Sequence, residues 1–155
     1  MDRRSRRTGL AGGVLLLVAV SGVGFPGAAA SPAPQASLEG AASNLTRIWQ
    51  RGSIELFAQI LVASGIRLRL RGEDHVALSR RQAVAVLRDY LGGHHTESIR
   101  VERATEVGGS PLRGFAELRW TVVHEGASQE VVHSVYVGFV REDEAWRVFE
   151  FRVLE

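Results

Sequence analysis

The stretch IRLRLRGEDHVALSRRQAVAVLRDYL, residues 66–91, contains two different hydrophobic periods, and their order indicates the fold class. Its first six residues alternate apolar and arginine side chains, which predicts a strand with one apolar and one basic face. Gly72–His75 predicts a turn after this strand. From Ser79 to Leu91, apolar side chains recur every three or four positions behind a capping box, which predicts a helix. The domain therefore combines helices with strands.

The regions on either side of this stretch differ in the same way. Before it, apolar spacing predicts two short helices that meet at Gly52. Ser43 or Asn44 would cap the first helix, and Gly65 would end the second. After it no helical pattern recurs, and four strands are predicted, at residues 97–107, 112–124, 129–140 and 145–154. Helices followed by strands are typical of the α+β class, so we expect three helices packed on a curved, four-stranded antiparallel sheet.

The first 30 residues have the three parts of a secretory signal peptide. Four arginines lie between Arg3 and Arg7, an apolar segment of eleven residues spans Leu10–Val20, and Ala28–Ala30 suits signal peptidase. Eleven residues rise only ~16 Å as a helix, against a bilayer core of roughly 30 Å, so a membrane anchor is the weaker interpretation. We therefore predict cleavage near Ser31 and a secreted or periplasmic protein.

The export route and the domain boundaries follow from the same region. Ser5–Thr8, followed by Leu10, resembles a twin-arginine signal, so the twin-arginine and the general secretory routes both stay open. Residues 31–42 begin with a Pro-, Ala- and Ser-rich segment and predict a flexible linker. Residues 43–155 then predict a single domain.

Composition excludes several functions. The formal net charge of +2 comes from the leader, because residues from Ser31 onward contain 15 arginines, 16 acidic residues and no lysine, a net charge of −1. A body this close to neutral argues against a nucleic-acid partner. The absence of cysteine excludes disulfides, thiolate metal ligands, a thiol nucleophile and a lipoprotein anchor. We expect no cofactor, and no membrane contact once the signal peptide is cleaved.

Four groups of core and turn residues carry a resemblance to a known superfamily: Ile66–Gly72, Ser79–Tyr90, Tyr136–Phe139 and Trp146–Val153. In this order they resemble the nuclear transport factor 2-like proteins, which include ketosteroid isomerase and scytalone dehydratase. Within that superfamily, the sequence is most similar to exported bacterial domains with no assigned function. The resemblance covers residues 43–155 and implies a cone-shaped fold. It is weaker evidence for function, because the matching residues belong mostly to the core and the turns.

The catalytic groups that this resemblance would require have no clear counterparts. Ketosteroid isomerase-like catalysis needs a carboxylate base near the first strand, and a tyrosine and a protonated carboxyl inside the cone. Only Glu73 and Asp74 lie near the first predicted strand, in its turn, and the first two predicted helices contain no tyrosine. The adjacent His94 and His95 lack a further ligand at a suitable spacing. We therefore predict no catalytic residue and no metal site.

One histidine falls on the apolar face of the predicted sheet. In the hairpin of residues 112–124 and 129–140, alternation puts Trp120 and His133 on the same concave face and near each other. A lone inward histidine is either a satisfied core residue, which we favour, or a polar group in a ligand pocket. Both interpretations stay open at this point.

The last strand has two alternative registers. Strict alternation puts Glu150 and Arg152 on the concave face near His133, which would form a polar ligand-binding cluster beside Trp120. A bulge after Val148 would instead turn three apolar side chains inward: Phe149, Phe151 and Val153. We favour the bulge, because two buried charges are costly unless they are well paired.

The same choice affects the convex face. Without the bulge, seven large apolar side chains would lie there: Phe115, Val132, Tyr136, Val140, Phe149, Phe151 and Val153. A patch of that size predicts a homodimer through this face, which the resemblance also implies, whereas the bulge makes the patch smaller.

Two functions remain after these exclusions. The first is a non-catalytic domain that binds a small apolar ligand or serves as a protein-interaction module. The alternative is a lyase or isomerase with its active site in the cone, where His133 would be the acid or base and Glu150 would orient it. We favour the non-catalytic function.

Overall fold

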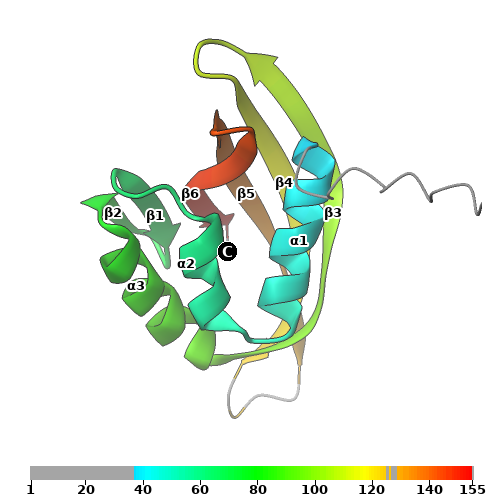
Figure 1. The fold of residues 1–155 in the computed structure, drawn as a ribbon. Helices are drawn as coiled ribbons and strands as arrows, with labels where there is room; N and C mark the ends of the chain where they lie inside the picture. The colour runs from blue at the N-terminus through cyan, green and yellow to red at the C-terminus, as the bar shows by residue number, and fades with distance from the viewer. Residues whose placement is uncertain (1–36, 125, 127–128, 155) are drawn as a thin grey trace, which may run out of the picture.

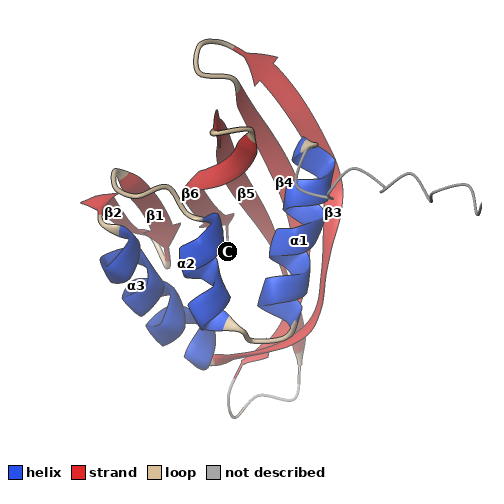
Figure 2. Cartoon of the chain, viewed as in Figure 1, coloured by secondary structure: helices blue, strands red, loops and turns tan. Residues whose placement is uncertain are grey.

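The computed structural model describes residues 37–124, 126 and 129–154, so the predicted signal peptide lies outside the described residues (Figure 1). Within these ranges, three α-helices and a short 3₁₀ helix lie on one side of a six-stranded sheet (Figure 2). None of the helices in the described ranges is long and apolar enough to cross a membrane. The fold is α+β, as the sequence predicted.

The first helix, α1 (Leu38–Gln50), begins earlier than the sequence predicted. Ser37 caps it, because its hydroxyl accepts a hydrogen bond from the backbone N–H of Gly40 at 3.1 Å. The flexible linker expected over residues 31–42 is therefore wrong for residues 38–42, while residues 31–36 lie outside the described residues. The reason is packing, because Leu38 and the alanines that follow it are buried against the sheet.

The third helix is close to its prediction, whereas the second ends at Ile60 and not at Gly65 as predicted, because the chain becomes extended at Leu61. The chain turns at Gly52 and continues as a short 3₁₀ helix, η1 (Ile54–Leu56), and then as α2 (Phe57–Ile60). The third helix, α3 (Arg80–Gly92), has the predicted capping box at its start. The Ser79 side chain accepts from the N–H of Gln82, and the Gln82 side chain accepts from the N–H of Ser79.

The sheet has six strands in the order β2-β1-β6-β5-β4-β3. They are β1 (Ile66–Leu70), β2 (Glu73–Leu78), β3 (His94–Gly108), β4 (Arg113–His124), β5 (Glu130–Glu142) and β6 (Ala145–Leu154). The four predicted long strands are confirmed, but the prediction of a four-stranded antiparallel sheet is wrong. β1 pairs with β6 in parallel, and it pairs with β2 as an antiparallel hairpin.

The strand β2 was predicted as part of a turn. The turn is shorter than the predicted turn over Gly72–His75, because Leu70 already pairs with Glu73. Its two residues, Arg71 and Gly72, have positive φ angles of 50° and 74°, as a two-residue hairpin turn requires. β2 is an edge strand whose residues are exposed or half-buried. It therefore lacks the apolar alternation by which sequence analysis finds strands.

The last strand contains the predicted bulge. Phe139 pairs with Val148 and Gly138 pairs with Glu150, so Phe149 is an extra residue in β6. After the bulge, Phe151 and Val153 are buried under the helices. Phe149 was predicted to turn inward as well, and this is wrong. As the bulged residue it lies on the convex face, where its ring covers Gly138 and lies 6.3 Å from the ring of Phe115.

Candidate functional site

Aromatic side chains from the helices and from the sheet meet in the centre of the cone. Trp49 of α1 lies 5.2 Å from Trp120 of β4 and 6.1 Å from Phe151 of β6, measured between ring centroids. Phe57 of α2 lies 6.0 Å from the ring of Phe151. All four side chains are buried, and their edge-to-face contacts fix the helices on the sheet.

A second group of side chains extends this cluster toward one end of the cone. His133 of β5 is only 4% exposed, and its ring lies 5.5 Å from Trp120, with which it is paired in register. On the other side of Trp120, His94 lies at 5.2 Å, and Tyr90 of α3 lies 4.8 Å from His94. The predicted neighbourhood of His133 and Trp120 is thus present, and Tyr90 and His94 belong to it too.

His94 is oriented by a backbone contact. Its Nδ1 lies 2.6 Å from the carbonyl oxygen of Tyr90. A carbonyl can only accept, so Nδ1 carries a proton, and in the neutral ring Nε2 is then the nitrogen that accepts a hydrogen bond. Sequence analysis missed this role, because it considered His94 and His95 as metal ligands. The i to i+4 spacing from Tyr90, at the end of the predicted helix, was the available signal.

A cavity of about 380 Å³ opens beside this group. The last turn of α1 and the residues after it, the last turns of α3, and the start of β3 form its walls. Trp49, Ile54 and Leu91 supply much of its apolar surface. Polar groups come from Gln50, Arg88, His94 and Thr96, among others. Neither Asp nor Glu is among the residues that line it.

The indole N–H of Trp49 is the unusual feature of this cavity. Trp49 is 2% exposed, and its Nε1 has no hydrogen-bond partner among the described residues. By contrast, the Nε1 of Trp120 donates to the hydroxyl of Thr96 at 3.0 Å. Buried polar groups are nearly always hydrogen-bonded, so the Trp49 N–H is a candidate donor to a ligand in this cavity.

The side chain of Gln50, next to Trp49, already has hydrogen-bond partners. The side-chain amide of Gln50 donates to the carbonyl of Glu97 at 3.2 Å and accepts from the N–H of Ile99 at 3.0 Å. These two bonds join the end of α1 to β3, and they hold this wall of the cavity in place. Gln50 therefore positions the cavity, and its own hydrogen-bonding groups are already used.

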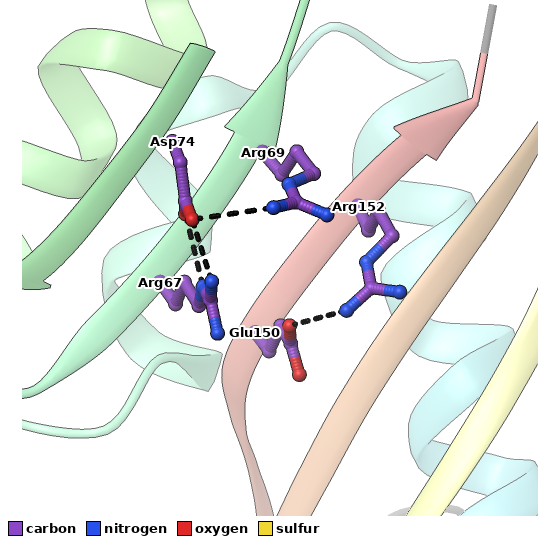
Figure 3. Close-up of polar contacts among 5 residues, drawn as sticks. All are labelled: Arg67, Arg69, Asp74, Glu150 and Arg152. Carbon is purple, nitrogen blue, oxygen red and sulfur yellow. Dashed lines mark hydrogen bonds and ion pairs between the residues drawn. The ribbon is translucent and has the colours of Figure 1, made fainter. Parts of the chain in front are cut away.

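The other two predicted ligand-binding residues lie on the opposite face of the sheet. Glu150 and Arg152 come after the bulge, are paired with each other at 3.3 Å, and project from the convex side beside β1 (Figure 3). The predicted cluster of His133, Glu150 and Arg152 is therefore wrong. The physical cause is the extra residue at Phe149, which reverses the alternation of the rest of β6.

Glu150 and Arg152 belong to a polar network on the convex face. The Nε of Arg67 donates to Asp74 at 2.9 Å, and a nitrogen of Arg69 lies 3.5 Å from the same carboxylate (Figure 3). The hydrogen bond from Arg67 lowers the pKa of Asp74, and the charges of both arginines act in the same direction. Asp74, predicted as a turn carboxylate near the first strand, is thus an ion-pair partner in β2.

The apolar patch on the convex face is smaller than an unbulged strand would make it. Phe151 and Val153 are buried in the core, and Val140 is 8% exposed. The large apolar side chains that remain half-buried or exposed there are Phe115, Val132, Tyr136 and Phe149. The unbulged strand on which the homodimer prediction depended is absent, and the dimer itself stays a prediction.

Comparison with known proteins identifies the fold. No protein-family model and no curated protein matches the sequence. A solved DUF4783 family protein from Bacteroides uniformis is similar over 72% of this chain and 93% of its own, at 12% identity and a TM-score of 0.60. An NTF-2 like protein of unknown function from Shewanella oneidensis matches over 74% of this chain and 93% of its own, at 9% identity and a TM-score of 0.56.

An enzyme is among the similar structures as well. An LEH-like epoxide hydrolase from M. tuberculosis matches over 77% of this chain and 82% of its own, at 15% identity and a TM-score of 0.56. The chain therefore has the nuclear transport factor 2-like fold, as the sequence predicted. At these identities the likeness shows the fold alone, because the same fold carries unrelated functions.

Proposed function

We propose that this domain binds a small, mainly apolar ligand in the cavity between the ends of α1 and α3 and the start of β3. The observation that carries the proposal is the indole N–H of Trp49, which is buried in the cavity wall without a partner among the described residues. A ligand oxygen that accepts from this N–H would satisfy it. His94, oriented through its Nδ1, would be the second polar contact.

The size and lining of the cavity support this class of ligand. A volume of about 380 Å³ lies within the range of roughly 300–1,000 Å³ that is typical of small-molecule sites. Apolar walls with a few polar groups favour a compact ligand with one or two hydrogen-bonding atoms, such as a ketone, an ether or an alcohol.

Catalysis is the weaker proposal. Glu150, which was to orient His133, lies on the other face of the sheet, and no carboxylate lines the cavity. His94 would then have to act without the orienting carboxylate that was predicted for His133. Binding therefore explains more of the geometry. Export remains part of the proposal, so a mature terminus near Ser31 is expected in secreted or periplasmic material.

Cyclohexanone, a compact ketone, is a suitable probe in a two-dimensional NMR titration of the indole N–H signals. The sequence has three tryptophans, and a Trp49→Phe variant assigns the signal of Trp49 by its loss. We expect cyclohexanone to move the Trp49 signal downfield. The Trp49→Phe variant should bind about fivefold more weakly, as loss of one hydrogen bond of ~1 kcal/mol implies.

Trp146→Phe is the matched control. Trp146 is also buried, and its Nε1 also lacks a partner among the described residues, but it does not line this cavity. Its variant should bind cyclohexanone like the wild type. Equal binding by all three proteins would show that the Trp49 N–H does not contact the ligand, and the proposal would fail.

A further inference from the structure

A second cavity, of about 430 Å³, lies between α1 and α2 and reaches the start of β6. We call it the α1–α2 groove. Arg47 and Arg51 from the α1 side and Arg147 of β6 line it, together with three apolar side chains: Ile48, Leu56 and Ile60. The groove is thus basic on some of its walls and apolar on others. Figure 1 shows the two helices that border it.

The three guanidinium groups of the α1–α2 groove have no carboxylate partner. Neither Asp nor Glu lines the groove. Within the described ranges, no carboxylate forms an ion pair with Arg47, Arg51 or Arg147. Like charges that share one cavity repel each other unless a negative charge lies between them.

Most other arginines in the described part of the chain are neutralised by a carboxylate. The pairs are Arg67 and Arg69 with Asp74, Arg88 with Glu55, Arg100 with Glu102, Arg103 with Glu117, Arg141 with Glu144, and Arg152 with Glu150. Five further arginines in the described ranges also form no ion pair: Arg71, Arg80, Arg81, Arg113 and Arg119. The α1–α2 groove differs from their surroundings because three such arginines line one cavity.

The groups of the α1–α2 groove are partly held in place. A guanidinium nitrogen of Arg147 donates to the backbone carbonyl of Gln59 in α2, which ties β6 to that helix. Arg47 and Arg51 are four residues apart and so lie on one face of α1. A guanidinium has five N–H donors in a planar fork, so each group has donors left for the oxygens of a carboxylate or a phosphate.

The apolar part of the α1–α2 groove narrows the ligand class. Ile48 is 6% exposed, whereas Leu56 is 39% exposed and so offers apolar surface to a ligand in the groove. We propose that the α1–α2 groove binds a small amphiphilic anion, with its carboxylate or phosphate on the three arginines and its apolar body against Ile48, Leu56 and Ile60. This site is separate from the ligand cavity beside Trp49, although Arg51 borders both.

Calorimetric titration of the purified chain with octanoate tests this proposal. Octanamide is the uncharged analogue, and inorganic phosphate is the anion without an apolar body. We expect octanoate to bind at least tenfold more tightly than either, and added salt to weaken it. The Arg47→Gln/Arg147→Gln variant, which leaves the lining of the Trp49 cavity unchanged, should bind octanoate at least tenfold more weakly.

Arg81→Gln/Arg119→Gln is the matched control. It removes the same charge from two exposed arginines that form no ion pair within the described ranges and line neither cavity, although the charge of Arg119 acts on Glu102. It should bind octanoate like the wild type. Circular dichroism checks the fold of each variant. If the Arg147 change prevents folding, Arg47→Gln alone carries the test, because its hydrogen bond is only to Asn44 of the same helix.

Three results would overturn the proposal. The first is octanamide binding as tightly as octanoate, because the arginines would then be irrelevant. The second is equal loss of octanoate binding in the groove variant and its control, which would indicate a general charge effect. The third is no octanoate binding by the wild type. If phosphatidylglycerol vesicles then bind the wild type but not the Arg47→Gln/Arg147→Gln variant, the groove would be a membrane-binding surface and the proposal would also fail.

Discussion

On the concave face of the sheet, every large side chain near the centre is apolar or aromatic, and Trp120, Val137 and Phe151 are fully buried. On the convex face of the same strands, charged and polar residues pair in register across all six strands. The row consists of Asp74, Arg69, Arg152, Tyr136, Glu117 and Arg103. Exposed ion pairs of this kind contribute little to stability, whereas buried apolar area contributes most of it. The concave face therefore contributes more to stability than the convex face, although residues of the two faces alternate along each strand.

The bulge in β6 decides which residues join which face. Before it, Trp146 and Val148 lie in the core, and after it Phe151 and Val153 do. Without the extra residue, Glu150 would be turned into the core and Phe151 would be turned out of it. The inserted residue thus keeps Glu150 and Arg152 on the convex face and Phe151 and Val153 in the core.

The largest effect should come from comparing the two phenylalanines around the bulge. Phe151→Ala removes a fully buried ring and should lower the free energy of unfolding by ~3–5 kcal/mol. Phe149→Ala removes a half-buried ring on the convex face and should cost only about 1–2 kcal/mol. Urea denaturation followed by circular dichroism measures both values. If both variants lost the same free energy of unfolding, the two faces would contribute equally to stability, which would contradict the comparison.

A smaller effect should follow from Gly138→Ala. A Cβ at this position would lie 2.7 Å from the ring of Phe149, so the ring must move, at about 1–2 kcal/mol. The loss should become smaller in a Phe149→Ala background but should not vanish, because the Cβ of Glu150 also lies 3.2 Å away, and a double-mutant cycle would measure the difference. Gly92→Ala is the control, because a Cβ there meets no atom within 4 Å. An unchanged loss in the Phe149→Ala background would contradict the contact.

The smallest effect should appear in the ion pairs of the convex face. The pKa of Asp74 in the folded protein lies below its ordinary value of 3.8, so its ion pairs stabilise the protein above that value. This stabilisation is lost as the pH falls below 3.8 and the carboxylate is protonated. Asp74→Asn should therefore lower the melting temperature slightly at pH 6 and leave it unchanged near pH 2. A difference that persists at pH 2 would show that Asp74 acts other than through its charge.

Local patterns in the sequence determined much of this fold. The sequence predicted the capping box at Ser79 and the hairpin that puts His133 opposite Trp120. Of the two registers considered for the last strand, it favoured the one with a bulge after Val148. Each depends on residues close in sequence, or on a strong preference such as the exclusion of unpaired charges from a core. The start of α1 was misplaced, because alanines in a helix and alanines in a linker look alike until their burial is known.

Only the tertiary structure determined which residues line the two cavities and which strand forms the edge of the sheet next to β1. Trp49 and His94 come from different parts of the chain, and nothing in the sequence shows that they line one cavity or that the N–H of Trp49 lacks a partner among the described residues. Arg147 joins Arg47 and Arg51 only because β6 packs beside α1 and α2. The edge strand β2 likewise forms by pairing with β1, without an apolar pattern of its own. Periodicity shows which side of an element is buried, whereas long-range packing determines which buried and polar groups meet.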